Sequence, residues 1–165
     1  MADQTLIPVV NEDDEIIDYK RRDLITTQDI YRVSALWLVN SQKEILLAKR
    51  ALTKSHDPGK WGPAVAGTVE QGEDYDSNII KEALEEIGLK DFEFKKMQKV
   101  RRQTNYDYFT QWYLAVVDQE INEFKINKAE VIEVKWFKLN ELEVKIIKKP
   151  MAFLPSVVWA IKQFK

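Results

Sequence analysis

Three glutamates crowd into one short stretch of this chain, at Glu82, Glu85 and Glu86. In a helix they lie at i, i+3 and i+4, so their carboxylates gather on one side, where like charges repel. Such an oxygen-rich cluster suits a hard cation such as Mg²⁺, which keeps some waters and shares its shell with substrate phosphates. The alternative is a solvated helix face, although such a face usually includes lysines at pairing distance.

The segment from Asp74 to Ile87 predicts the helix that carries these glutamates. It opens with acidic residues, and Gly88 follows as a stop that tolerates left-handed geometry. At about 100° per residue, one side of this helix is apolar. That side holds Ile80, Ala83, Leu84 and Ile87. We therefore expect the three glutamates on the opposite, outer side.

The segment resembles the Nudix box of Nudix hydrolases, whose pattern is G-x5-E-x7-R-E-U-x-E-E-x-G-U, with U an aliphatic residue. The matching positions are Gly67, Glu73, Glu82, Glu85, Glu86, Gly88 and Leu89, with Ala83 at the other aliphatic place. Lys81 stands where the family has arginine. The resemblance covers residues 67–89.

This resemblance implies hydrolysis of a diphosphate linkage in a nucleoside diphosphate derivative or related organic diphosphate, with Mg²⁺ or Mn²⁺. It makes Glu82, Glu85 and Glu86 metal ligands, one of them also a candidate base. The carbonyl of Gly67 would be a further ligand. Glu73 and Lys81 would hold the loop against the helix. A divalent ion suits this chemistry because it offsets phosphate charge and lowers the pKa of a bound water.

A second acidic stretch, AEVIEVKWFKLNEL, resembles the E-V-x-E-x-x-W segment found near the end of this domain. In some relatives an acid there reaches the metal, which makes Glu130 and Glu133 possible metal ligands or bases. The alternative is a strand edge with solvated acids. Trp136 is expected in the core.

Basic and aromatic residues near the box could bind the substrate. Arg50 is the first candidate for phosphate, because a guanidinium can bind it through two parallel hydrogen bonds. Lys60 is a second candidate. Weaker ones are Lys54, Arg101 and Arg102, with Tyr106 or Tyr108 for stacking on a base. His56 is expected to serve in a turn rather than in catalysis.

The elements that must position these residues are consistent with an α/β fold. We expect strands at 31–39, 44–50, 64–66, 92–100, 108–117 and 131–137, and helices around 141–147 and from Pro155 onward. The apolar run at 31–39 indicates a strand buried on both faces. The order predicts a mixed β-sheet in an α/β/α sandwich, as in Nudix enzymes, with a catalytic loop-helix-loop. We expect one Nudix domain over 1–165, with an N-terminal β-hairpin extension at 1–30.

Composition narrows the function classes. The chain has no cysteine, which excludes disulfides, thiol catalysis and thiolate metal sites. Its net charge of −2 gives no sign of a nucleic acid polymer as partner. The longest apolar run, VSALWLV, is too short to span a membrane, and the start does not resemble a signal peptide. We expect a cytoplasmic protein with a small-molecule diphosphate substrate, and a homodimer is a further expectation from the family.

Two other functions compete with hydrolysis. The N-terminal half resembles a Nudix subgroup related to isopentenyl diphosphate isomerase, which uses a cysteine and a histidine-rich metal site. Ala66 stands in place of that cysteine and Thr68 in place of a metal-binding histidine. A methyl group cannot protonate a carbon, which argues against isomerase activity. The other alternative is a non-catalytic Nudix-fold domain that binds a nucleotide or a protein.

Overall fold

The computed structural model describes residues 4–164, and in that range nine strands form one sheet. The strands are β1 (Leu6–Val10), β2 (Ile16–Arg21), β3 (Ile30–Val39), β4 (Ile45–Arg50), β5 (Trp61–Pro63), β6 (Val65–Thr68), β7 (Lys95–Gln103), β8 (Asp107–Val116) and β9 (Val131–Phe137). The α-helices are α1 (Tyr75–Ile87), α2 (Leu139–Lys148) and α3 (Pro155–Gln163). Short 3-10 turns lie at Arg22–Leu24, Ile121–Glu123 and Pro150–Ala152.

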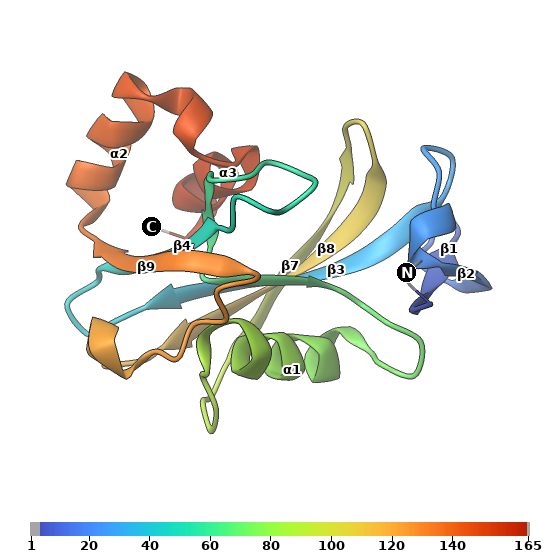
Figure 1. The fold of residues 1–165 in the computed structure, drawn as a ribbon, viewed down its shortest axis with the longest axis horizontal. Coiled ribbons are helices and arrows are strands. Elements are labelled where there is room, and N and C mark those ends of the chain that lie inside the picture. Colours follow the sequence, from blue (N-terminus) through green and yellow to red (C-terminus); the bar gives the residue numbers. More distant parts are fainter. Residues whose placement is uncertain (1–3, 165) are drawn as a thin grey trace.

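The helices lie on both faces of the sheet, with α1 on one face and α2 and α3 on the other (Figure 1). Strand β3 pairs in parallel with β8 and antiparallel with β1, β4 and β6. The predicted α/β sandwich with a mixed sheet is therefore confirmed. None of the helices in residues 4–164 is long and apolar enough to cross a lipid bilayer.

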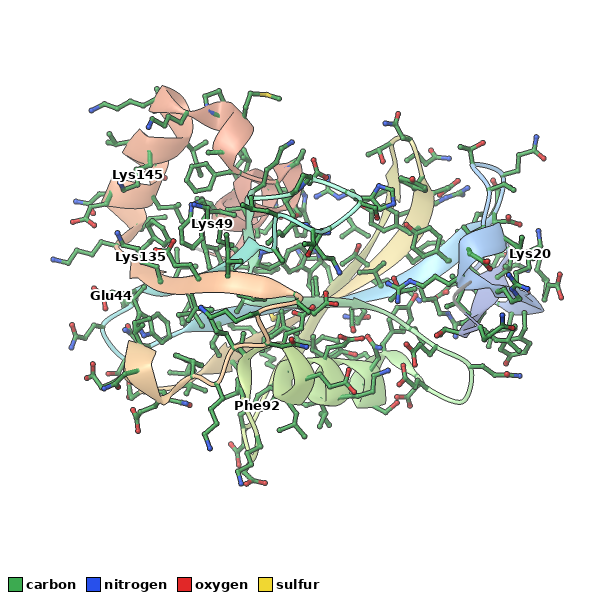
Figure 2. The ribbon with its side chains drawn as sticks, viewed as in Figure 1. Lys20, Glu44, Lys49, Phe92, Lys135 and Lys145 are labelled. Atoms are coloured by element: carbon green, nitrogen blue, oxygen red, sulfur yellow. The ribbon has the colours of Figure 1, made fainter. Side chains whose placement is uncertain are left out.

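The middle of β3 is buried on both faces, as its unbroken apolar run predicts. Leu36 and Leu38 pack in the core under α1, whereas Ala35 and Trp37 pack in the core under α2 and α3. Side chains fill the space between the sheet and each helical layer (Figure 2). A strand between two cores gives the fold a rigid centre to which the other elements attach.

The N-terminal hairpin is fastened to the start of α1 by a buried carboxylate. Asp14, in the β1–β2 turn, accepts hydrogen bonds from Arg32 Nε at 2.7 Å and from the Tyr75 hydroxyl at 3.1 Å. Lys99 forms an ion pair with the same carboxylate. The Gln71 N–H also donates to the Leu6 carbonyl at 2.8 Å. The hairpin therefore holds both the first residue of α1 and the loop before it.

Two strand boundaries differ from the expected ones. The strand expected at 92–100 begins at Lys95 and continues to Gln103, because β7 forms a hairpin with β8 that pairs Gln103 with Asp107. Phe92 and Phe94 lie before it and pack against each other, with ring centroids 5.9 Å apart. The short strand expected at 64–66 is β6, which covers Val65–Thr68 and pairs with β3, and β5 before it, which pairs with β4, was not expected.

Candidate active site

Local sequence sets both ends of α1. Asp74 is the N-cap: its carboxylate accepts the Ser77 N–H at 2.8 Å, and the Ser77 hydroxyl accepts the Asp74 N–H at 3.0 Å. At the other end Gly88 has a φ of 68°, and the Leu89 N–H donates to the Ala83 carbonyl at 3.0 Å. The helix therefore begins one residue later than expected and ends where the sequence predicts.

The buried side of α1 differs from the expected one. Ile80 and Leu84 are 50% and 53% exposed, whereas Ile79, Ala83 and Ile87 are fully buried. The prediction that Ile80 and Leu84 belong to the apolar side was wrong. The shared outer side expected for the three glutamates was also wrong, because only one of them is exposed. Glu85 faces solvent, while Glu82 and Glu86 are partly covered.

Gly67 explains why the helix can lie with Glu82 toward the sheet. A Cβ atom at Gly67 would overlap the carboxylate end of Glu82, so any other residue would push that side chain away. Gly67 lies in β6, opposite Ser34 of β3 in the strand ladder. The absence of a side chain at this position permits the close approach of α1 to β6.

Burial keeps the two inward glutamates from ionising readily. It raises the pKa of Glu82 to about 7; Lys81 opposes this rise, and Glu85 and Glu70 add to it. It raises the pKa of Glu86 to about 8, and repulsion from Glu82 adds to the effect. Glu86 accepts one long hydrogen bond, from the Ala66 N–H at 3.4 Å. The pair is therefore short of positive charge.

Glu86, Arg50 and Glu130 meet in one small pocket. The rest of its wall is apolar and consists of Ala48, Gly62, Pro63, Ala66, Val131 and Leu154. Glu130 forms an ion pair with Lys54 of the β4–β5 loop. Arg50 donates from Nε and Nη2 to the His56 carbonyl, at 3.1 and 2.9 Å. Positive and negative side chains thus line the same opening beside α1.

Lys81 links the loop before α1 to the helix. Its Nζ lies 2.6 Å from Glu73 Oε1 and 2.9 Å from Glu70 Oε2. Burial by itself would raise the pKa of Glu73, but hydrogen bonds from Lys81, the Glu70 N–H and Asn78 outweigh it and lower that pKa. Burial by itself would lower the pKa of Lys81, but the two carboxylates outweigh it and raise that pKa. A lysine at the arginine position therefore reaches two carboxylates at once.

Several predicted site residues lie away from the pocket. Glu133 is exposed on β9, opposite Lys49. Lys60 pairs with Asp57 at 2.7 Å and lines a separate, more open groove beside α3. Arg101 pairs with Asp107 at 2.8 Å.

The aromatic candidates pack against neighbouring rings. Tyr106 packs on His56, with ring centroids 5.0 Å apart, and Tyr108 packs on Tyr31, with ring centroids 5.4 Å apart. The guanidinium of Arg102, a further candidate, lies 5.0 Å from the centre of the Trp159 ring. Trp136 packs against the core under α1, as expected.

Three residues near the glutamates were missed from the sequence. Asn78 and Ser34 are fully buried and hydrogen-bonded to each other next to Glu82. An asparagine among apolar neighbours on a helix was the available signal for the first. Arg22 donates to the Thr68 hydroxyl at 3.3 Å and partly opposes the rise in the pKa of Glu82, but nothing in the sequence pointed to it.

The donors at this site fit a hard divalent cation. Within residues 4–164, no three acidic or histidine side chains lie close enough together to hold an ion as they stand. Mg²⁺ does not need three, because it binds through one or two carboxylates and fills its shell with water and phosphate oxygens. Glu82 and Glu86 supply two partly covered carboxylates whose pKa values are raised chiefly by burial, and a bound cation would favour their ionised form.

Comparison with known proteins gives consistent results. A family model of the NUDIX domain matches residues 30–155, a range that begins at β3. The prenyl-diphosphate phosphatase of Methanosarcina mazei is 28% identical over 155 residues, covering 92% of this chain and 90% of that protein. The isopentenyl-diphosphate Delta-isomerase of Citrobacter koseri is 27% identical over 131 residues, covering 74% of this chain and 70% of the isomerase. The crystal structure of DR0079 from Deinococcus radiodurans has the same fold, with a TM-score of 0.83 at 22% identity over 97% of this chain and 99% of that one.

Proposed function

Because this chain belongs to the NUDIX domain family, we propose that it hydrolyses the phosphoanhydride bond of a small organic diphosphate with the help of Mg²⁺ or Mn²⁺. The observation that carries this proposal is the pair Glu82 and Glu86. They are covered carboxylates on α1 with raised pKa values, and Glu86 lines a pocket that also contains Arg50. Ionising covered carboxylates of this kind is costly unless a cation binds there.

The residues of this chain can be given distinct tasks. Glu82 and Glu86 would hold the ion, together with Glu85 and the Gly67 carbonyl if these turn toward it. A bound divalent ion offsets the charge of the diphosphate and lowers the pKa of its water. Glu86 and Glu130 both line the pocket and are the carboxylates placed to accept a proton from an attacking water.

Arg50 is the residue best placed to bind phosphate. Two of its N–H groups bond to the His56 carbonyl, and a guanidinium has five. The remaining donors can bind a phosphate oxygen at the pocket. Lys54 would contribute a second positive charge when its ion pair with Glu130 opens. We do not assign this task to Lys60, because it lines a different groove.

The substrate carries a diphosphate, and its other part is open to test. One relative is a prenyl-diphosphate phosphatase, which favours including prenyl diphosphates beside nucleoside diphosphate derivatives. The isomerase relatives suggest a second activity. This chain has no cysteine, however, and Ala66 stands where the resemblance to the isomerase would require the cysteine. That observation argues for hydrolysis.

A substrate screen tests the proposal. The protein is incubated with both diphosphate classes in the presence of Mg²⁺, Mn²⁺ or a chelator, and released phosphate or monophosphate is measured. We expect metal-dependent release that Glu86→Gln lowers by about 100-fold or more. The matched control is Glu141→Gln on the exposed surface of α2, which should leave turnover unchanged. Equal turnover by the Glu86→Gln variant and the parent would show that Glu86 is not a catalytic or metal-binding residue. Metal binding without turnover would favour the non-catalytic alternative.

A further inference from the structure

Two buried polar residues link the central strand to the glutamate site. Ser34 of β3 and Asn78 of α1 are both 0% exposed. The Ser34 hydroxyl donates to the Asn78 side-chain carbonyl oxygen. Ser34 also pairs with Gly67 in the β3–β6 ladder. A serine from one element and an asparagine from another therefore meet directly behind the glycine that faces Glu82.

The amide of Asn78 faces the catalytic loop. Its Nδ2 donates to Glu73 Oε2 at 2.9 Å and to the Thr68 carbonyl at 3.1 Å, and lies 3.5 Å from Glu82 Oε1. The NH₂ group has two hydrogens, so the two shorter contacts are the main ones and Glu82 receives the weakest. One side chain thus contacts β6, the loop after it and the next turn of α1.

Ser34 completes the hydrogen bonding of this amide. The Glu73 carboxylate and the Thr68 carbonyl can only accept, so they hold the NH₂ group on their side, and the Ser34 hydroxyl donates to the amide oxygen that remains toward β3. If the amide turned over, its oxygen would face the Glu73 carboxylate and its NH₂ group would lose both acceptors. A polar pair is not needed merely to fill the core, because two apolar side chains in these places would be buried at a lower desolvation cost.

We propose that Ser34 and Asn78 are positioning residues that set the affinity of the site for its divalent cation. Asn78 ties Thr68 and Glu73 to the helix that carries Glu82, and Ser34 acts through Asn78. Gly67 precedes Thr68 directly, so this link also sets the distance between the Gly67 backbone and the Glu82 carboxylate. The inference rests on the proposed function, because it assumes that these carboxylates bind the ion.

The test measures Mn²⁺ binding directly, by the electron paramagnetic resonance signal of free Mn²⁺, together with kcat and Tm. We expect Asn78→Leu to weaken Mn²⁺ binding by about 10-fold or more, the range found when the outer partners of metal ligands are removed. Ser34→Ala should weaken it by a smaller factor. The matched control is Ile79→Val, a neighbouring core change on α1 that lowers Tm without touching the carboxylates.

The double variant distinguishes positioning from general loss of stability. If Ser34 acts through Asn78, Ser34→Ala in the Asn78→Leu background has no further effect on Mn²⁺ affinity. If Asn78→Leu fails to fold, the Mn²⁺ affinity of Ser34→Ala is compared with that of Ile79→Val at a similar loss of Tm, and only Ser34→Ala should bind Mn²⁺ more weakly. The inference is overturned if Asn78→Leu and Ser34→Ala bind Mn²⁺ as tightly as a parent that binds the ion and hydrolyses substrate, or if the affinity falls equally in the Ile79→Val control. A parent that neither binds Mn²⁺ nor hydrolyses any diphosphate overturns the proposed function and this inference together.

Discussion

Replacing Gly67 with alanine separates the fold from the function of the site. Gly67 is not one of the glycines with positive φ, so alanine causes no backbone strain there. The added methyl group would overlap the Glu82 side chain at its Cγ, Cδ and Oε1 atoms. These atoms form the flexible end of a long side chain, so Glu82 can turn away without moving the backbone of α1.

The expected magnitudes follow from which atoms must move. Because only a rotatable side chain is displaced, the free energy of unfolding should change by no more than about 1 kcal/mol. The nearest Glu82 atoms, however, would lie 2.3 Å from the new Cβ, so they have to move by roughly 1 Å to reach ordinary van der Waals contact. Displacements near 1 Å in a catalytic group cost on the order of 100-fold in rate, and we expect kcat to fall by that factor.

Gly72→Ala provides the opposite pattern as a control. Gly72 has a φ of 86°, and a Cβ there would meet no atom within 4 Å. Alanine at this position should cost roughly 1–2 kcal/mol of stability because of its left-handed backbone, while Glu82 keeps its place. Unfolding in urea and initial rates on the substrate found in the screen measure both effects. The reasoning is refuted if Gly67→Ala keeps kcat within about threefold of the parent, or if both variants lose stability and activity in proportion.

The remaining predictions concern pH, Lys81 and the N-terminal hairpin. In the metal-free protein, Tm should fall as the pH rises from about 5 to 8. The reason is that folded Glu82 and Glu86 keep their protons to about pH 7 and 8, whereas the unfolded chain releases them near 4.5. Saturating Mg²⁺ should reduce this fall, and a flat Tm profile without metal would contradict the raised pKa values. Lys81→Met should lower kcat by about 10-fold, because the positive charge at this position bridges two carboxylates. Lys81→Arg keeps that charge and should keep kcat. Equal rates for the parent and both variants would show that the bridge does not affect turnover. Asp14→Asn should lower the free energy of unfolding, measured in urea, by about 3 kcal/mol, because Arg32 then lacks the negative charge of its buried partner. The backbone should not add to this loss, because asparagine tolerates the φ of 62° at this position. A loss below about 0.5 kcal/mol would mean that this network does not fasten the hairpin.

The sequence by itself determined the local features and the family. Asp74 with Ser77 and the left-handed Gly88 set the ends of α1, because capping depends on residues within one turn of each other. The apolar run of β3 predicted a strand buried on both faces, since its burial is independent of which neighbours cover it. The box spacing likewise lies within a single loop and helix, and it was sufficient to predict the family and the carboxylates.

Only the tertiary structure decided where those carboxylates lie. Glu82 can face the sheet because Gly67 in β6 leaves room for its side chain, and helical periodicity in the isolated segment could not show this. The same holds for Arg50, which lines the pocket, and Lys60, which lines another groove: their backbones are hydrogen-bonded to each other, and only the packing around them sends the two side chains to different places. Ser34 and Asn78 are 44 positions apart, and neither residue points to the other within its own element. Contacts of this range arise when the sheet and the helix pack together, so no short window of sequence contains them.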